Sequence, residues 1–153
     1  EASMSHVANV EVEINDLDAL KTACTKLGIE FVEGQTTYAW YDRYLADSDV
    51  GRQTVQDGFK PEDFGKCEHA IKVPGSDYEV GVVKNPTGNG YRLIYDEYGS
   101  NGSAITQRLG GTQLTTLKTE YGVVRATRHL QRSGYRVVRR VLANGTVKIT
   151  GVQ

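Results

Sequence analysis

Six arginines lie close together near the end of the sequence, and their guanidinium groups are well suited to bind an anion. They are Arg125, Arg128, Arg132, Arg136, Arg139 and Arg140. The first three are spaced three and four residues apart, so a helix would place them on one face. The planar guanidinium fork holds phosphate or carboxylate through two parallel hydrogen bonds. We therefore expect an anion-binding face here, with a nucleotide or nucleic acid as the candidate ligand.

The distribution of charge along the chain leaves two interpretations of these arginines open. Residues 1–106 contain 9 Lys and Arg against 18 Asp and Glu, whereas residues 107–153 contain 9 Lys and Arg and one acid, Glu120. A net charge of −1 for the chain therefore combines −9 in the first part with +8 in the second. The basic part either binds an anionic partner or packs against the acidic part and is neutralised there.

Three aromatic residues are candidates for stacking on a base or on a small planar ligand: Tyr38, Trp40 and Tyr41. Base stacking on aromatic rings tolerates different sequences, because every base has a π-face. The alternative is that these rings fill a hydrophobic core. The sequence alone does not choose between the two.

No pattern of catalytic or cofactor-binding residues accompanies the arginines. The chain has three histidines, none beside a Gly-x-Ser-x-Gly motif: His6, His69 and His129. Gly58 and Gly65-Lys66 lack the spacing of a phosphate-binding loop, and Cys67-Glu68-His69 supplies too few ligands for zinc. A calcium loop starting at Asp47 would place Gly58 where the bidentate acid is needed. We expect no metal, no cofactor and no catalytic residues, and enzyme activity has the least support.

The first half of the sequence predicts strands around one helix. Residues 7–14 are expected to form a strand, because Val10, Val12 and Ile14 alternate with two glutamates, the pattern of a half-buried strand. A helix follows over 17–27, capped by Asn15 or Asp16. Further strands are expected at 29–32, at 36–44, which is rich in Thr and Tyr, and then at 68–73, 78–84 and 91–98, with a turn at Pro74-Gly75. Residues 45–66 form a long polar segment, interpreted as an ordered loop or an insertion with some helical turn.

The second half predicts a long helix and a hairpin. Residues 99–103 are expected to form a flexible connector before a short helical turn at 104–109, and residues 112–133 a helix. The segments 135–142 and 146–152 form a hairpin through Asn144-Gly145. A two-residue turn would pair Leu142 with Val147, and would place Val138, Arg140, Leu142, Val147 and Ile149 on one face. The order of elements predicts an α+β fold with a mainly antiparallel sheet, two main helices on one face and a C-terminal β-hairpin.

Several of these segments resemble a known family, the hypothetical chloroplast reading frame thirty-five family. The opening Met4-Ser5-His6-Val7 and residues 15–21 are similar to its start, and residues 70–85 to its central hairpin. The closing helix, Gly134-Tyr135 and the hairpin around Asn144-Gly145 follow its layout. The family is a domain of unknown function found in plastids, cyanobacteria, other bacteria and some phages.

The resemblance covers most of the chain and implies a small non-catalytic binding or accessory protein, for which a phage origin is one alternative. It supplies no established catalytic residues. The sequence departs from the family at Tyr95-Asp96-Glu97-Tyr98-Gly99, where the family commonly has Asp-Trp-Trp-Gly, and residues 45–66 look like an insertion. The leading expectation is a protein partner or a second copy of the chain. The alternative is a protein that captures an anionic ligand on the arginine face.

The two cysteines, Cys24 and Cys67, are too few for a disulfide framework. A reducing, cytoplasmic location is therefore expected, and no apolar run is long enough to suggest a membrane partner. Glu1-Ala2-Ser3 before Met4 is interpreted as a cloning remnant, and residues 4–153 as a single domain.

Overall fold

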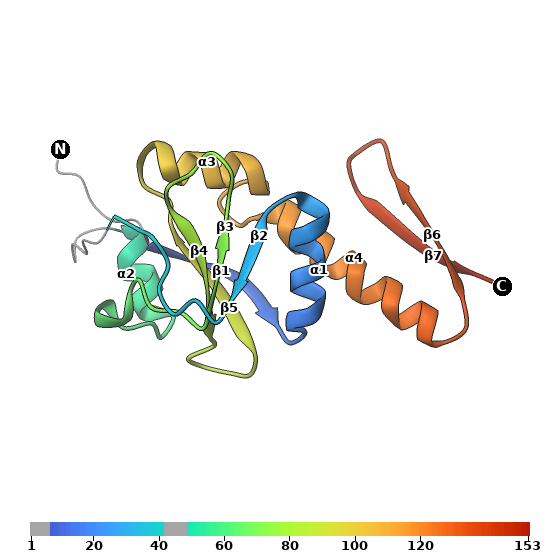
Figure 1. The fold of residues 1–153 in the computed structure, drawn as a ribbon, viewed down its shortest axis with the longest axis horizontal. Coiled ribbons are helices and arrows are strands. Elements are labelled where there is room, and N and C mark those ends of the chain that lie inside the picture. Colours follow the sequence, from blue (N-terminus) through green and yellow to red (C-terminus); the bar gives the residue numbers. More distant parts are fainter. Residues whose placement is uncertain (1–6, 42–48) are drawn as a thin grey trace.

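The structure, a computed structural model, describes residues 7–41 and 49–153 (Figure 1). Its main sheet is antiparallel and has the strand order β1-β5-β4-β3-β2, and a separate C-terminal hairpin joins β6 to β7. The predicted α+β class is confirmed. The elements are β1 (Val7–Ile14), α1 (Leu17–Leu27), β2 (Glu30–Glu33), α2 (Asp49–Gln56), η1 (Pro61–Asp63), β3 (His69–Lys72), β4 (Glu79–Lys84), β5 (Tyr91–Asp96), α3 (Gly99–Leu109), α4 (Thr115–Arg132), β6 (Arg136–Val141) and β7 (Val147–Val152).

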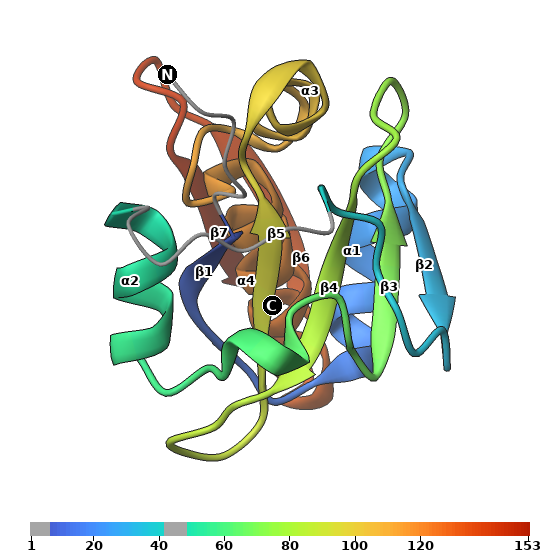
Figure 2. The same ribbon diagram turned by 90° about the vertical axis from the view of Figure 1, so that its left-hand side faces the viewer.

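The two main helices, α1 and α4, pack together on one face of the main sheet, as predicted (Figure 2). Asp16 caps α1, because its Oδ1 accepts a hydrogen bond of 3.0 Å from the Ala19 amide. The hydroxyl of Tyr121 in α4 accepts hydrogen bonds from the amides of Asn15 and Asp16, at 3.1 and 3.2 Å. One side chain therefore fixes α4 against the start of α1.

The second face of the sheet is covered by α2, η1 and an irregular segment, so the strand predicted over 36–44 is wrong where the structure describes it. Residues 36–41 form no strand: they make an isolated bridge between Thr37 and Lys66, and the Ala39 carbonyl accepts one hydrogen bond of 2.9 Å from the Glu79 amide. Tyr38 is buried on this face with Ile94 and Phe64. The segment has the composition of a strand because its rings cover a sheet, although it does not join one. Residues 42–44 of that prediction lie outside the described residues.

The polar segment predicted over 45–66 contains α2 and the single turn η1, and residues 45–48 lie outside the described part of the chain. The Thr54 hydroxyl in α2 donates a hydrogen bond of 2.6 Å to the Val7 carbonyl. Val55 packs beside the cluster of the second face. This contact holds α2 against the start of β1.

The connector predicted over 99–103 is wrong, because these residues form the first turns of α3. Ile105 and Leu109, further along the helix, are fully buried in the main core. The Ser76 hydroxyl donates to the Asn101 carbonyl at 2.8 Å, and the Asn101 side chain accepts from the Asp77 amide, also at 2.8 Å. These tertiary contacts stabilise a helix whose first turns consist of poor helix formers.

The C-terminal hairpin forms as predicted, but its register differs by one residue. Val141 pairs with Val147, so the loop between Leu142 and Thr146 has three residues instead of two. The Gly145 amide donates to the Leu142 carbonyl at 2.9 Å, and Gly145 takes a φ of 85°, which suits a three-residue loop ending in a left-handed residue. The predicted grouping of Val147 and Ile149 with Val138 is therefore wrong, since a one-residue shift moves a side chain to the opposite face.

We predict opposite effects of alanine at two glycines that differ in their surroundings. A Cβ at Gly81 would lie 2.5 Å from Cδ1 of the Tyr38 ring, so Gly81→Ala should lower the free energy of unfolding by about 1–3 kcal/mol. Gly122 in α4 has nothing within 4 Å of its Cβ position, so Gly122→Ala should raise it by about 0.5–1 kcal/mol through helix propensity. Urea unfolding measures both. Equal effects of the two substitutions would contradict the close packing of Tyr38 on β4.

Candidate binding surfaces

The six arginines all lie in one part of the molecule, which we call the C-terminal lobe: residues 125–153, comprising the end of α4 and the hairpin β6–β7. Figure 1 shows this lobe at one end of the molecule, with the hairpin beside the last turns of α4. No residue from 121 to 153 is acidic. The lobe is therefore strongly cationic wherever its guanidinium groups are not paired with acids from elsewhere.

Glu120 and Arg139 attach the hairpin to α4. Both guanidinium NH groups of Arg139 donate to the Glu120 carboxylate, at 2.9 and 3.0 Å. The Glu120 side chain is 8% exposed and that of Arg139 is 42% exposed. The hydrogen bonds to Glu120 raise the pKa of Arg139 above its ordinary value. Because neighbouring strand residues point to opposite faces, this contact sets which face of β6 looks toward α4.

The inner face of the hairpin, which includes Arg139, also contains Val137, Val147 and Ile149. These three side chains are each partly buried. Gly151 on the same face lies against Leu130 of α4, since a Cβ there would come 3.1 Å from that side chain. The inner face is therefore the face through which the hairpin packs on α4.

Arg128 and Arg125 are also engaged within the chain. Arg128 reaches across to α1, where it donates to the Asp18 carboxylate at 2.8 Å and to the Thr22 hydroxyl at 2.7 Å. The guanidinium of Arg125 lies 5.7 Å from the centre of the Tyr121 ring, within the range of a cation–π contact. The predicted face of three arginines on α4 is thus only partly available to a ligand.

The remaining three arginines of the predicted site are unpaired. Within the part of the chain that the structure describes, Arg132, Arg136 and Arg140 make no ion pair or side-chain hydrogen bond. Arg136 and Arg140 lie on the outer face of the hairpin, and Lys148 stands directly opposite Arg140 in the register. Two like charges directly opposite each other destabilise a strand pair. An anionic group placed over this face would remove that repulsion.

The outer face is apolar as well as cationic. It alternates Arg136, Val138, Arg140 and Leu142 along one strand, and Val138 is 44% exposed and Leu142 37% exposed. Large apolar side chains exposed together in this way are typical of a surface that contacts another molecule.

The structure does not bring the predicted stacking residues to the arginines. Tyr38, Trp40 and Tyr41 lie with the second face of the main sheet, whereas α4 covers the first. Trp40 packs edge-on against Phe64, with ring centres 5.9 Å apart, and Tyr41 lies 5.7 Å from Tyr98. Tyr38 is 2% exposed. The arginines and the aromatic residues therefore do not share one site, and the alternative that these rings fill a core holds for Tyr38.

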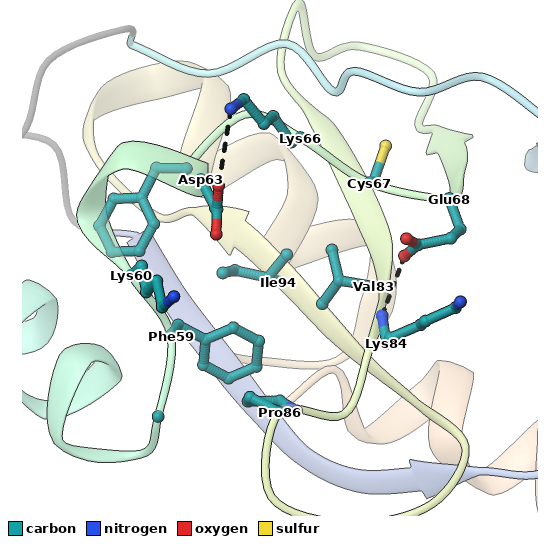
Figure 3. A pocket seen from close by; sticks show the side chains of 12 residues that line it. Phe59, Lys60, Asp63, Lys66, Cys67, Glu68, Val83, Lys84, Pro86 and Ile94 are labelled. Carbon is teal, nitrogen blue, oxygen red and sulfur yellow. Dashed lines mark hydrogen bonds and ion pairs between the residues drawn. The ribbon is translucent and has the colours of Figure 1, made fainter.

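A pocket on the second face was not predicted from the sequence (Figure 3). It has a volume of about 350 Å³, and its lining comes from residues 58–68, from the end of β4 with Pro86, and from Ile94 of β5. Figure 3 shows Val83 and Ile94 at its centre, with Lys60, Lys66 and Lys84 around them. These residues lie up to 36 positions apart in the chain (58 to 94), so no local motif indicates them.

Cys67 is one of the residues that line this pocket, and it is 8% exposed. It donates a hydrogen bond of 3.2 Å to the Gln35 carbonyl. Burial raises its pKa to about 12, and burial also raises the pKa of the Cys24 thiol to about 12. Both thiols are therefore protonated at neutral pH, and neither is an activated nucleophile.

Comparison with known proteins does not place the chain in a family: no family model matches it, and neither curated proteins nor solved structures give a significant match. The resemblance to the chloroplast reading frame family stays a prediction. No helix among the described residues is long and apolar enough to span a membrane.

We predict that Arg139 stabilises the fold, whereas Arg136 on the same strand does not. Arg139→Met would leave the buried Glu120 carboxylate without its partner, and should lower the free energy of unfolding by about 1 kcal/mol, a low value because Arg139 is partly exposed. Arg136→Met should change it by less than about 0.5 kcal/mol. Urea unfolding and amide hydrogen exchange in β6 and β7 measure the difference.

A double-mutant cycle checks the origin of this effect. Adding Glu120→Gln to Arg139→Met should cost less than the sum of the two single substitutions, because the second change removes an already unpaired charge. Strict additivity, or an equal loss in Arg136→Met, would show that the ion pair does not fix the hairpin.

Proposed function

We propose that the chain is a non-catalytic binding protein whose outer hairpin face docks on an acidic, partly apolar surface of a protein partner. The observation that supports this is the alternation of unpaired Arg136 and Arg140 with exposed Val138 and Leu142 on one face. A partner with carboxylates and apolar side chains complements both kinds of residue. The proposal agrees with the accessory role that the family resemblance implies.

The apolar residues favour a protein over nucleic acid as the partner. A phosphate backbone would neutralise Arg136 and Arg140, but it offers little apolar surface to cover Val138 and Leu142. An interface between proteins usually has an apolar centre with charged groups at its rim. Arginine is also enriched at such interfaces.

The free edges of the hairpin support the same kind of partner. In the described part of the chain β6 and β7 pair only with each other, so each strand has one edge with unpaired backbone groups. An exposed edge can accept a strand from another chain through main-chain hydrogen bonds. Such pairing would bring the partner's side chains next to the outer face.

Nucleic acid capture is the second candidate function, and the pairing of Arg140 with Lys148 favours it. Two cations held opposite each other, with no acid in residues 121–153, match the repeated negative charge of a nucleic acid strand. A two-stranded β-ribbon also fits the major groove of duplex DNA. This candidate does not account for the exposed apolar side chains.

Titrations with three defined probes separate these candidates. The probes are a capped peptide of repeating Glu-Ser-Leu-Ser units, which places Glu and Leu on one face of an extended strand, a matched peptide of Glu-Ser-Ser-Ser units and a mixed-sequence DNA duplex. Each titration is followed by fluorescence anisotropy at several salt concentrations. We expect the leucine-containing peptide to bind most tightly. Arg136→Glu with Arg140→Glu should weaken it by about tenfold or more, and Val138→Ser by about three- to tenfold.

The matched control is Lys60→Glu with Lys84→Glu, which makes the same change of charge at two exposed residues outside the C-terminal lobe. It should leave peptide binding unchanged. If the duplex binds more tightly than the leucine-containing peptide and Val138→Ser has no effect on its affinity, the partner is nucleic acid and not a protein. Failure of all three probes to bind at low salt would overturn the docking proposal.

A further inference from the structure

The main sheet ends at two edge strands, and the protein closes the outer edge of one of them. At β1, the Glu11 amide donates a hydrogen bond of 2.9 Å to Gln113 Oε1, and the Glu11 carbonyl accepts one of 3.3 Å from Lys118 Nζ. The Thr54 hydroxyl holds the Val7 carbonyl at the start of the same strand. Side chains from other elements thus occupy backbone groups of β1 that an added strand would need.

The outer edge of β2, at the other end of the sheet, has no such cover among residues 7–41 and 49–153. Figure 2 shows β2 as the outermost strand there, and it pairs with β3 alone. Within the same residues, the backbone of β2 makes one hydrogen bond outside the sheet, from the Gln35 amide to the Val32 carbonyl, and it is long, at 3.5 Å. An unpaired edge of this kind can accept a strand from another chain through main-chain hydrogen bonds.

A groove lies beside this edge. It has a volume of about 730 Å³ and lies between β2, the second half of α1 and the turn at Pro74-Gly75. Phe31 on β2 lines the groove and is partly buried against the main core. The other large apolar residues of the lining are Ile29, Val73 and Pro74. The edge of β2 therefore combines free backbone groups with apolar side chains that a partner can cover.

One charged side chain of the groove is left without a partner, and its charge is negative. Lys21 binds the Glu33 carboxylate at 2.9 Å, and Lys72 binds that of Glu79 at 2.6 Å. Glu30 is exposed, and in the described part of the chain its side chain makes no ion pair or hydrogen bond. The edge of β2 thus presents a free carboxylate beside apolar side chains, which is the chemistry that the outer face of the hairpin complements.

Charge selects which of these open edges can pair between copies of the chain. Two hairpins would bring the Arg136, Arg140 and Lys148 side chains of one copy against the same cations of another. Two β2 strands would bring Glu30 and Glu33 of one copy against the same acids of another. Like charges on neighbouring strands destabilise a strand pair. The pairing of β2 with the hairpin, in contrast, brings opposite charges together.

The two strands also match in the spacing of their residues. Glu30 and Val32 lie on one face of β2, two residues apart. Arg140 and Val138 lie on the outer face of β6 with the same spacing. In an antiparallel pair, the register that sets the two valines opposite each other also sets Glu30 opposite Arg140. A single register therefore satisfies both the charged and the apolar residues.

We propose that the chain associates with copies of itself head to tail: the hairpin of one copy joins the open edge of β2 in the next, where its arginines meet glutamates. This interface rests on the proposed function, since it uses the same face of the hairpin and identifies the partner as a second copy of the chain. Its two surfaces differ, so each assembly keeps a free hairpin at one end and a free β2 edge at the other. Association of this kind builds a chain of copies or a closed ring, not a two-fold dimer.

Sedimentation velocity of the full chain measures this association at several protein and salt concentrations. We expect the mean mass to rise beyond that of a dimer as the protein concentration increases, and to fall with added salt, which screens the charges across the interface. Glu30→Lys with Glu33→Lys, and separately Arg136→Glu with Arg140→Glu, should each weaken association by about tenfold or more. All four positions are exposed, and the amide spectrum of each variant checks that it keeps its fold.

A mixture of these two variants is the sharpest test. Alone, each variant carries the same sign of charge on both of its surfaces, but the new lysines on β2 of one complement the new glutamates on the hairpin of the other. The equimolar mixture should therefore recover the association that each variant has lost. The matched control is Glu11→Lys with Glu13→Lys, the same change of charge at two exposed residues of β1, the strand with the closed edge. It should associate as the unchanged chain does.

Three results would overturn the proposal. They are a chain that stays monomeric at millimolar concentration, association that the β2 substitutions leave unchanged, and a mixture of the two variants that does not associate. If the chain stays monomeric but still binds the leucine-containing peptide, the docking face holds and the second copy is not its partner. If the chain stays monomeric and no probe binds, the docking face fails as well.

Discussion

The contact between Glu120 and Arg139 sets the orientation of the C-terminal hairpin, and the exposed surface of the lobe depends on it. Glu120 is the only acid after residue 106, and its side chain in α4 is only 8% exposed. A buried carboxylate needs a partner, and Arg139 supplies two hydrogen bonds. Once Arg139 points toward α4, alternation along β6 turns Val138 and Arg140 outward. One buried acid thus determines which cations remain available to another molecule.

Helix α4 has two parts: its first part packs in the main core, and its last turns support the proposed binding face of the hairpin. Leu117, Tyr121 and Val124 belong to the main core, and the residues beyond them support the hairpin. The outer face of the hairpin therefore lies away from that core, and a partner can cover it without repacking Leu117 or Tyr121. The pocket on the second face is related to the core differently, since Ile94 and Phe64 belong both to its wall and to the buried cluster. Substitution of the exposed Lys60 beside the pocket leaves that cluster intact, whereas substitution of Ile94 or Phe64 disturbs it.

The sequence was sufficient to predict elements that are specified locally. The alternation in β1, the Asp16 cap and the turn at Pro74-Gly75 all depend on neighbours within a few residues, and each was found where expected. Residues 36–41 were assigned wrongly because Tyr38 covers a sheet face through contacts with residues 64–81. The first turns of α3 were missed for a similar reason, since Asn101 is held by Ser76 and Asp77. The hairpin register depended on a choice between a two- and a three-residue loop, which Asn144-Gly145 alone does not make.

The candidate site was only partly predictable, because long-range pairing decides which arginines are free. The sequence left two interpretations open for all six arginines: neutralisation within the chain or binding of an external anion. In the structure some of them are paired and others are not. Arg128 pairs with Asp18, 110 residues earlier, and Arg139 pairs with Glu120, so neutralisation holds for the arginines that face the body of the protein. It does not hold for Arg132, Arg136 and Arg140. Arg128 and Arg139 are paired on the inner side of the lobe. The unpaired positive charge of the hairpin, that of Arg136 and Arg140, therefore lies on its outer face. Partial self-neutralisation therefore produces the polarity of the lobe: its inner side is matched to the protein, and its outer side lacks acids and can be matched only by another molecule.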